Sequence, residues 1–305
     1  MKRGWRGLAV AASLLLGGGC TSLPDAPEVI RLAADATRLG NDGDAGPHGV
    51  GCAAVRRNTH LSDGATLHLC WPVDAEQVRV PGAFPAAILV PGGLVSAERY
   101  AWLQTHLVSR GYVVVLPEFP LDLPLLDAEP AVAARALLDE LATTGDATLA
   151  GSVSLTNGVG VLGHSLGGVV ATQRWLDDAD LGALVLLASF PADADDVQAR
   201  AGDPVLVLSG ARDGASTPVE VSAGFERFGT PRWLGLVSGM NHYDWTDGVR
   251  DDERAGDQAA TRPTAASRRD ALRLLDAFLD AQLGGDPQGW ARLDAGVFPG
   301  VELRR

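Results

Sequence analysis

One stretch of the chain decides its fold: residues 159–171 read VGVLGHSLGGVVA. An apolar run, 159–162, leads into Gly163-His164-Ser165-Leu166-Gly167, and a second apolar run begins after the next glycine. A buried strand that ends in G-x-S-x-G and turns at once into a helix makes a strained turn that lifts the serine hydroxyl above the sheet. The glycines at Gly163 and Gly167 leave room for that turn. The stretch predicts Ser165 as a nucleophile; the alternative is a serine that only caps the helix.

Apolar runs and helical patterns alternate on both sides of this stretch. The predicted buried strands are Ala86–Val90, Val113–Leu116, Gly182–Ala188, Pro204–Ser209 and Arg232–Val237. The predicted helices are Ala97–Arg110, Pro130–Thr144, Pro218–Phe228 and Thr264–Leu283. Upstream, Gly51–His60 and Ala65–Val73 predict a hairpin. The predicted fold class is α/β: a mainly parallel central sheet with helices on both faces and an antiparallel N-terminal hairpin.

Length and composition are those of one globular domain with two distinct terminal segments. The chain has 305 residues and a net charge of −13, which argues against a nucleic-acid partner. Residues 48–283 are expected to form the domain. Residues 21–47 are rich in Pro, Asp, Gly and Ala and predict a flexible tether. Residues 284–305 are expected to form a loosely attached C-terminal tail.

The first twenty residues are typical of an export signal. Lys2, Arg3 and Arg6 precede an apolar run, Leu8–Leu16, that is too short to span a bilayer. Gly17-Gly18-Gly19-Cys20 follows and resembles a bacterial lipoprotein signal, with Cys20 as the lipidated first residue. The alternative is ordinary secretion with cleavage nearby. In either case the mature chain is expected outside the cytoplasm, with membrane attachment only through lipid at Cys20.

Two further cysteines could form a disulfide. With Cys20 assigned to lipidation, Cys52 and Cys70 remain as an even pair, which suits an oxidising compartment. They flank Ser62-Asp63-Gly64, the expected turn of the hairpin. A two-residue turn would put Cys70 opposite Arg57 rather than Cys52, so a disulfide needs a bulge or a longer loop. The pairing stays open at this point.

Residues after the later strands can complete a catalytic triad. Serine becomes a nucleophile when a base takes its proton, and histidine suits that task because its pKa lies near neutral pH. A carboxylate then fixes the imidazole tautomer. Asp213 and His242 follow successive predicted strands, in the chain order serine, acid, histidine. Less well placed are the acids Asp203, Asp244 and Asp247 and the histidines His48, His60, His68, His106 and His164.

A tetrahedral intermediate carries a negative oxygen that needs two prearranged N–H donors. Leu166, the first residue after the nucleophile, is expected to supply one donor. The other is expected from Pro91-Gly92-Gly93-Leu94, which follows the first buried strand. Gly93 is the preferred donor in that loop and Leu94 the alternative. No metal and no cofactor are expected.

Together these residues resemble the α/β-hydrolase superfamily over about Gly51–Leu283. The runs GHSLGG (163–168) and PGGLVSAERYAWLQTHLVSRGYVVVLPEFP (91–120) are similar to lid-poor serine esterases. That branch includes the chlorophyllase-like, dienelactone-hydrolase-like and cutinase-like polyester hydrolases. The resemblance implies a Ser-His-Asp esterase with Ser165, Asp213 and His242 as the triad. It also implies the amides of Gly93 and Leu166 as the oxyanion hole.

Several positions depart from these relatives. Gly93 stands where polyester hydrolases usually carry an aromatic residue, and Phe190 is the nearest aromatic where they carry tryptophan. Both changes remove a substrate clamp, which argues against plastic or cutin as the substrate. Dienelactone hydrolases use a cysteine nucleophile, whereas this chain has Ser165. The connection from Ala188 to Pro204 is too short for a helical lid, so we expect an open site for small or extended esters.

The predicted activity is hydrolysis of a small-molecule or polymeric carboxylic ester through an acyl-enzyme. Two alternatives stay open. One is a non-catalytic, envelope-anchored binding protein on the same fold. The other is an acyltransferase or peptidase that uses the same three side chains.

Overall fold

The computed structural model describes residues 45–58, 64–143 and 149–305. The predicted signal peptide at 1–20, the lipidation site Cys20 and most of the tether at 21–47 lie outside the described residues. Within the described part of the chain, no helix has both the length and the apolarity needed to cross a bilayer.

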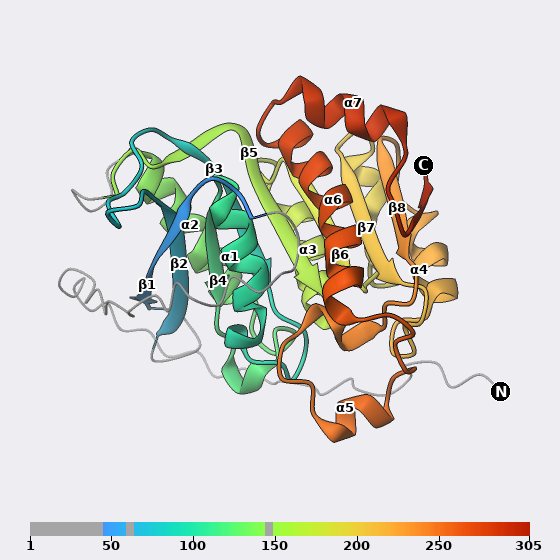
Figure 1. Ribbon diagram of the computed structural model, residues 1–305. Helices are drawn as coiled ribbons and strands as arrows, with labels where there is room; N and C mark the ends of the chain where they lie inside the picture. The colour runs from blue at the N-terminus through green and yellow to red at the C-terminus, as the bar shows by residue number, and fades with distance from the viewer. Residues whose placement is uncertain (1–44, 59–63, 144–148) are drawn as a thin grey trace.

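A nine-stranded sheet runs through the described residues in the order β1-β2-β4-β3-β5-β6-β7-β8-β9 (Figure 1). Its strands are β1 (Gly49–Arg57), β2 (Ala65–Val73), β3 (Phe84–Val90), β4 (Val113–Pro117), β5 (Val153–His164), β6 (Ala183–Leu187), β7 (Val205–Gly210), β8 (Arg232–Val237) and β9 (Val301–Arg304). Strands β3 to β8 are parallel, whereas β1, β2 and β9 are antiparallel to their neighbours. The predicted parallel sheet with an antiparallel N-terminal hairpin is confirmed.

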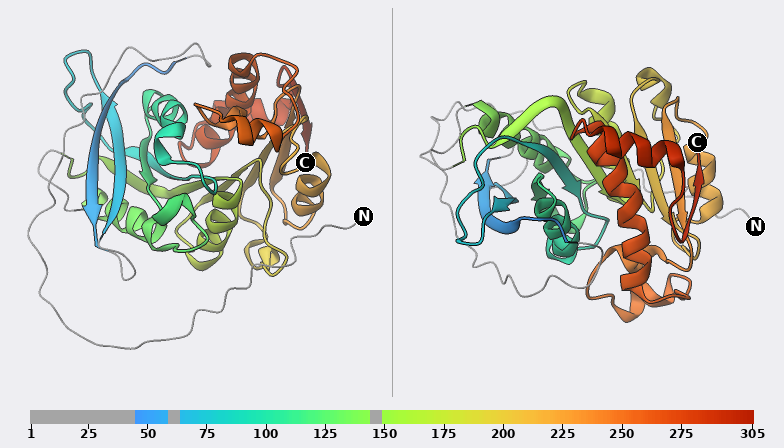
Figure 2. Two further views of the ribbon diagram at one scale, coloured as in Figure 1. Left: turned by 90° about the horizontal axis from the view of Figure 1, so that it is seen from below. Right: turned by 45° about the horizontal axis from the view of Figure 1, so that its top comes forward.

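Helices cover both faces of the sheet. They are α1 (Ala101–Ser109), α2 (Glu129–Thr143), α3 (Leu166–Asp177), α4 (Pro218–Phe225), α5 (Asp251–Ala255), α6 (Thr264–Gln282) and α7 (Pro287–Ala295). The view from below shows α1 and α6 on one side of the sheet and α2 and α3 on the other (Figure 2). The predicted helix over 97–110 is present as a 3-10 turn, η1 (Ala97–Tyr100), followed directly by α1.

Strand β3 shows why the central strands are unbroken apolar runs. Successive side chains of a strand point to opposite faces. Accordingly, Leu89 packs into the core cluster that contains α1 and α6, whereas Ile88 and Val90 pack into the cluster that contains α2, α3 and α4. A strand buried on both faces has no position left for a polar side chain. The strand ends at Val90, and Pro91 and the Gly92-Gly93 loop follow at its carboxyl end.

The N-terminal hairpin settles the question of the disulfide. Cys52 lies opposite Cys70 in the register, and a disulfide joins them. The expected two-residue turn was wrong, because Arg57 pairs with Ala65 and not with Cys70. Residues 58–64 therefore connect the strands, and the longer connection brings the two cysteines into register.

The C-terminal segment corrects another expectation. Residues 284–305 do not form a loosely attached tail: they contain α7 and β9. Helix α7 packs closely on α6, where the absence of a side chain at Gly289 lets the backbones approach, and Leu293 is fully buried. Strand β9 pairs antiparallel with β8. This pairing protects what would otherwise be an open sheet edge.

Candidate functional site

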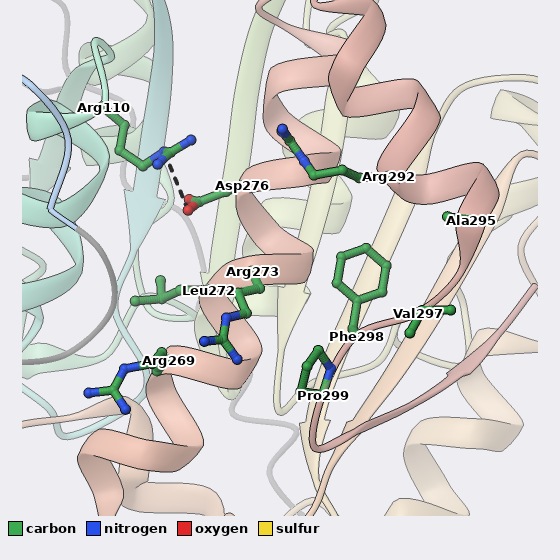
Figure 3. Close-up of a pocket in the computed structure, with 10 residues that line it drawn as sticks. All are labelled: Arg110, Arg269, Leu272, Arg273, Asp276, Arg292, Ala295, Val297, Phe298 and Pro299. Atoms are coloured by element: carbon green, nitrogen blue, oxygen red, sulfur yellow. Dashed lines mark ion pairs between the residues drawn. The ribbon is translucent and has the colours of Figure 1, made fainter.

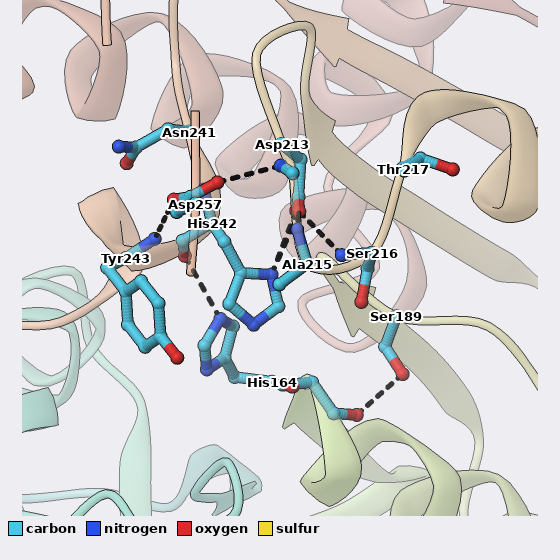
Figure 4. Close-up of polar contacts among 12 residues, drawn as sticks. His164, Ser189, Asp213, Ala215, Ser216, Thr217, Asn241, His242, Tyr243 and Asp257 are labelled. Atoms are coloured by element: carbon cyan, nitrogen blue, oxygen red, sulfur yellow. Dashed lines mark hydrogen bonds and ion pairs between the residues drawn. The ribbon is translucent and has the colours of Figure 1, made fainter. Parts of the chain in front are cut away.

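The predicted site residues meet at the carboxyl edge of the parallel strands. Ser165 directly follows β5, Asp213 follows β7 and His242 follows β8. In open α/β sheets this edge is where ligands bind, because the loops there converge from several strands. Figure 4 shows the loops of Asp213 and His242 facing each other there.

Ser165 alone forms the turn between β5, which ends at His164, and α3, which begins at Leu166. Its backbone is strained, with φ 51° and ψ −124°. A Cβ added at Gly163 would lie 2.3 Å from the carbonyl oxygen of Gly167, and one added at Gly167 would lie 2.1 Å from that of Pro91. Both positions therefore require glycine. The Ser165 side chain makes no capping hydrogen bond to α3, which argues against a purely capping role.

Buried hydrogen bonds join the predicted acid and base. The Nδ1 of His242 lies 2.9 Å from Oδ2 and 3.1 Å from Oδ1 of Asp213. The amides of Ala215 and Ser216 donate to Oδ1 at 2.9 and 2.6 Å. Burial raises the pKa of Asp213, while the hydrogen bond and charge of His242 act in the opposite direction. The donors surrounding Asp213 suit it to hold one tautomer of His242.

The other candidate acids lie elsewhere. Asp203 is at the amino end of β7 and pairs with Arg200. Asp244 accepts from the amide of its neighbour Asn241, and Asp247 pairs with Arg268 at 2.9 Å. Within the described residues, Asp213 is therefore the candidate acid that contacts the His242 ring.

The half-buried Ser165 makes no hydrogen bond to His242 within the described residues. The two residues are linked through His164, the neighbour of Ser165. The Nε2 of His164 donates to the His242 carbonyl oxygen at 3.2 Å, and the two imidazole centroids are 4.7 Å apart. Catalytic hydrogen bonds are often long without substrate and tighten in the reacting complex. Because the Asp213 carboxylate contacts Nδ1, the ring nitrogen of His242 that it leaves unbonded is Nε2.

The structure distinguishes the possible oxyanion donors. The amide of Leu94 donates to the carbonyl of Asp122 at 2.6 Å, and the amide of Gly92 donates to the Tyr100 hydroxyl at 2.8 Å. This leaves Gly93 as the candidate in the loop. A Cβ added at Gly93 would lie 2.5 Å from Cδ1 of Leu166, so the two predicted donor residues are in direct contact.

Sequence reasoning missed a buried hydrogen-bonded chain behind this loop. Tyr100, which accepts from Gly92, donates its hydroxyl proton to Nδ1 of His164 at 2.7 Å. His164 in turn donates from Nε2 to the backbone of His242. Burial, with a smaller contribution from the nearby His242, holds the pKa of His164 well below its usual value of 6.5. His164 is therefore neutral, as acceptance at Nδ1 requires.

The neutral His164 predicts a pH-dependent stability. As pH falls below 6.5, the unfolded chain binds a proton at this residue that the folded chain does not, until the lower folded-state pKa is reached. This costs about 1.4 kcal/mol of unfolding free energy per pH unit. Between pH 7.5 and 5.5 the wild type should therefore lose about 1.4 kcal/mol more than His164→Gln, as measured by urea denaturation. Equal losses in the two proteins would contradict a neutral, buried His164.

A second carboxylate, Asp257, connects the loops of the acid and the base. Its Oδ2 accepts from the backbone amides of His242 at 2.8 Å and Tyr243 at 3.3 Å. Its Oδ1 accepts from those of Gly214 at 2.7 Å and Gln258 at 2.8 Å. Figure 4 shows Asp257 between the loops of Asp213 and His242. Asp257 lies in a polar stretch far from any predicted strand, so no sequence signal singled it out.

The segment that carries Asp257 is fixed to the rest of the site by an ion pair. Arg99, in η1, bonds both carboxylate oxygens of the buried Glu253 at 2.6 and 2.9 Å. Burial raises the pKa of Glu253, but its hydrogen bond and charge interaction with Arg99 outweigh this, and the pKa is lowered. By contrast, the connection between β6 and β7, residues 188–204, contains only a 3-10 turn, η3 (Val197–Arg200). The segment that carries Asp257 and is anchored beside the site therefore comes after β8, not between β6 and β7.

A separate cavity of about 330 Å³ lies beside α6 and α7 (Figure 3). Four arginines contribute to its lining, but much of their charge is already compensated. Arg110 lies 3.3 Å from Asp276, and Arg292 lies 2.7 Å from Asp280. The lining of this cavity contains none of the predicted catalytic residues. The candidate active site therefore remains the carboxyl edge of the sheet.

Comparison with known families agrees with this architecture. A model of the alpha/beta hydrolase family matches residues 86–269, which is more than half of the chain. The match begins in β3 and ends in α6, so it includes the strained turn at Ser165 and the loops of Asp213 and His242. The expected superfamily is confirmed, and family membership supports a hydrolase. The chain belongs to the α/β-hydrolase family.

Proposed function

We propose that this protein is a serine hydrolase of carboxylic esters. The observation that carries the proposal is the buried Asp213–His242 pair at the sheet edge where the strained turn presents Ser165. A carboxylate on Nδ1 leaves Nε2 as the base, which is the arrangement that activates a serine. If the Asp213–His242 pair had only a structural role, nothing would explain why Ser165 is held beside it at an energetically unfavourable backbone angle.

In the proposed reaction, Ser165 attacks the ester carbonyl while Nε2 of His242 takes its proton. The amides of Gly93 and Leu166 donate to the resulting oxyanion. The protonated His242, stabilised by Asp213, then gives the proton to the departing alcohol, which leaves an acyl-enzyme. Water, deprotonated by the same imidazole, attacks the acyl-enzyme and releases the acid. Every step uses side chains and amides of this chain.

We also propose that the enzyme works outside the cytoplasm, on small-molecule or polymeric esters. The Cys52–Cys70 disulfide supports this, because such bonds persist in oxidising compartments. The N-terminal sequence supports a bacterial envelope lipoprotein attached through Cys20, or a secreted protein.

The proposal is tested by two measurements on the purified protein. A fluorophosphonate probe should label the wild type, and p-nitrophenyl butyrate should be hydrolysed to p-nitrophenol and butyrate. A protein that takes no label and turns over no ester would be a binding protein on this fold. Transfer of the butyryl group to an added alcohol or amine in preference to water would instead indicate an acyltransferase.

Asp257 provides a test of how the triad is held. In Asp257→Asn, one carboxylate oxygen becomes an amide nitrogen that cannot accept from an amide. Either the His242 loop or the Gly214 loop thereby loses its hydrogen bonds. Because small misplacements of catalytic groups are costly, kcat for p-nitrophenyl butyrate should fall by about 10- to 100-fold with little change in KM.

The matched control is Asp251→Asn, which removes an exposed carboxylate from the same segment. It should keep the wild-type kcat. If Asp257→Asn kept wild-type kcat, or lost activity only in proportion to a loss of folded protein, Asp257 would not be a positioning residue.

A further inference from the structure

Exposed leucines concentrate at one place in the structure. Leu94, Leu121, Leu125 and Leu126 are 57%, 78%, 48% and 60% exposed. Within the described residues, no other leucine belongs to the exposed class. We call these four residues the leucine rim. Isolated exposed leucines are ordinary, but a gathering of them on a soluble domain indicates a contact surface.

The leucine rim adjoins the catalytic residues. Leu94 follows β3 and the other three follow β4, and these neighbouring parallel strands end at the edge where Ser165 lies. The amide of Leu94 donates to the carbonyl of Asp122 at 2.6 Å, which joins the two loops. On its other side, Leu94 follows Gly93, which contacts Leu166. Residues in contact with one another therefore connect Ser165 and Leu166 to the leucine rim through Gly93 and Leu94.

The backbone holds this rim in an unfavourable conformation. Leu94 has φ 61°, Leu121 φ 55° and Asp122 φ 54°. Apart from glycine, mainly asparagine and aspartate adopt this region, so the two leucines are the strained positions. The loop nevertheless begins at the buried Phe119 and ends where the Asp127 carboxylate accepts from the amide of Glu129 at 2.9 Å. Strain of this kind persists mainly where function requires it.

We propose that the leucine rim binds the acyl chain of the substrate, and that the enzyme prefers esters of long, apolar acids. This inference rests on the proposed esterase function and narrows its substrate class. In the proposed complex the carbonyl oxygen lies between the amides of Gly93 and Leu166, and the acyl chain, rather than the departing alcohol, leaves the carbonyl carbon on the side of Leu94. A chain that extends across Leu121 and Leu126 removes apolar surface from water on both partners. An acetyl group has only one carbon beyond its carbonyl and offers little apolar surface to such a contact.

The test compares p-nitrophenyl acetate with p-nitrophenyl decanoate below its aggregation concentration. In Leu121→Ser and in Leu126→Ser, kcat/KM for the decanoate should fall by about tenfold, because apolar contact area is lost. For the acetate it should stay within about twofold of wild type, which shows that the fold and the chemistry are intact. The control is Val297→Ser, which alters a residue 79% exposed before β9. This variant should leave kcat/KM for both esters at the wild-type value.

Three results would overturn the proposal. The first is an unchanged ratio of decanoate to acetate kcat/KM in both rim variants. The second is an equal effect of Val297→Ser. The third is a wild-type dimer, detected by light scattering, combined with rim variants that are monomeric but keep the wild-type chain-length preference. In that case a second copy of the chain, not an acyl chain, would cover the leucines. Failure of the esterase proposal looks different: the wild type would hydrolyse neither ester and would take no fluorophosphonate label.

Discussion

Replacing Ser165 by alanine is expected to lower kcat for p-nitrophenyl butyrate by about a millionfold, to the level given by binding and oxyanion stabilisation alone. The reason is covalent: without the hydroxyl there is no acyl-enzyme, and His242 has no nucleophile to deprotonate. Alanine keeps the Cβ that makes this backbone angle unfavourable, so the strain remains. The serine hydroxyl makes no capping hydrogen bond, so the variant is expected to fold with a stability close to that of the wild type.

The measurement combines a stopped assay at high enzyme concentration with fluorophosphonate labelling. The control is Ser154→Ala, which removes a serine hydroxyl near the opposite end of β5 and should leave both readouts unchanged. Persistence of labelling or of burst kinetics in Ser165→Ala would place the nucleophile on another residue and refute the proposed mechanism.

Replacing Asp213 by asparagine is expected to lower kcat by about 10⁴-fold. In the wild type both carboxylate oxygens accept from Nδ1 of His242. The amides of Ala215 and Ser216 donate to Oδ1, so an asparagine oxygen should stay there and its NH₂ should face the imidazole. Nδ1 must then accept a hydrogen bond, the proton moves to Nε2, and the base can no longer take the serine proton. KM should change little, because Asp213 is fully buried and offers no surface to a substrate.

The control for this prediction is Asp203→Asn, at the amino end of the same strand, which breaks the ion pair with Arg200 and leaves the site untouched. Its kcat should match the wild type. If Asp213→Asn instead kept more than a tenth of the activity, another carboxylate would have to orient His242.

The central strands were predictable because each carries its own signal. Arg232–Val237 is β8 to the residue, and the run Val113–Leu116 misses only the last residue of β4. Burial on both faces makes such strands apolar throughout, so the pattern does not depend on knowing the neighbours. The strained turn at Ser165 was predictable because its G-x-S-x-G pattern lies within five consecutive residues. Only the collision that Gly163 avoids is local, with Gly167 and Gly168, whereas Gly167 makes room for the distant backbone of Val90 and Pro91.

Pairing between distant segments was harder to predict from the sequence. Strand β9 has four residues and alternates polar with apolar side chains, which is also common in a solvated tail. Only its register with β8 makes it a strand. The register of Cys52 with Cys70 likewise depended on the length of a connection whose turn chemistry pointed to a shorter one.

The sequence by itself determined the fold class, the order of the strands along the chain and the three candidate catalytic side chains. Periodicity and turn chemistry are local and can be read from neighbouring residues. The tertiary structure alone decided what supports those side chains. The Tyr100–His164 hydrogen bond and the contacts of Asp257 with the loops of Gly214 and His242 join residues far apart in the chain. A tyrosine or an aspartate becomes such a support only when folding places a partner within about 3 Å, and no local pattern records that encounter.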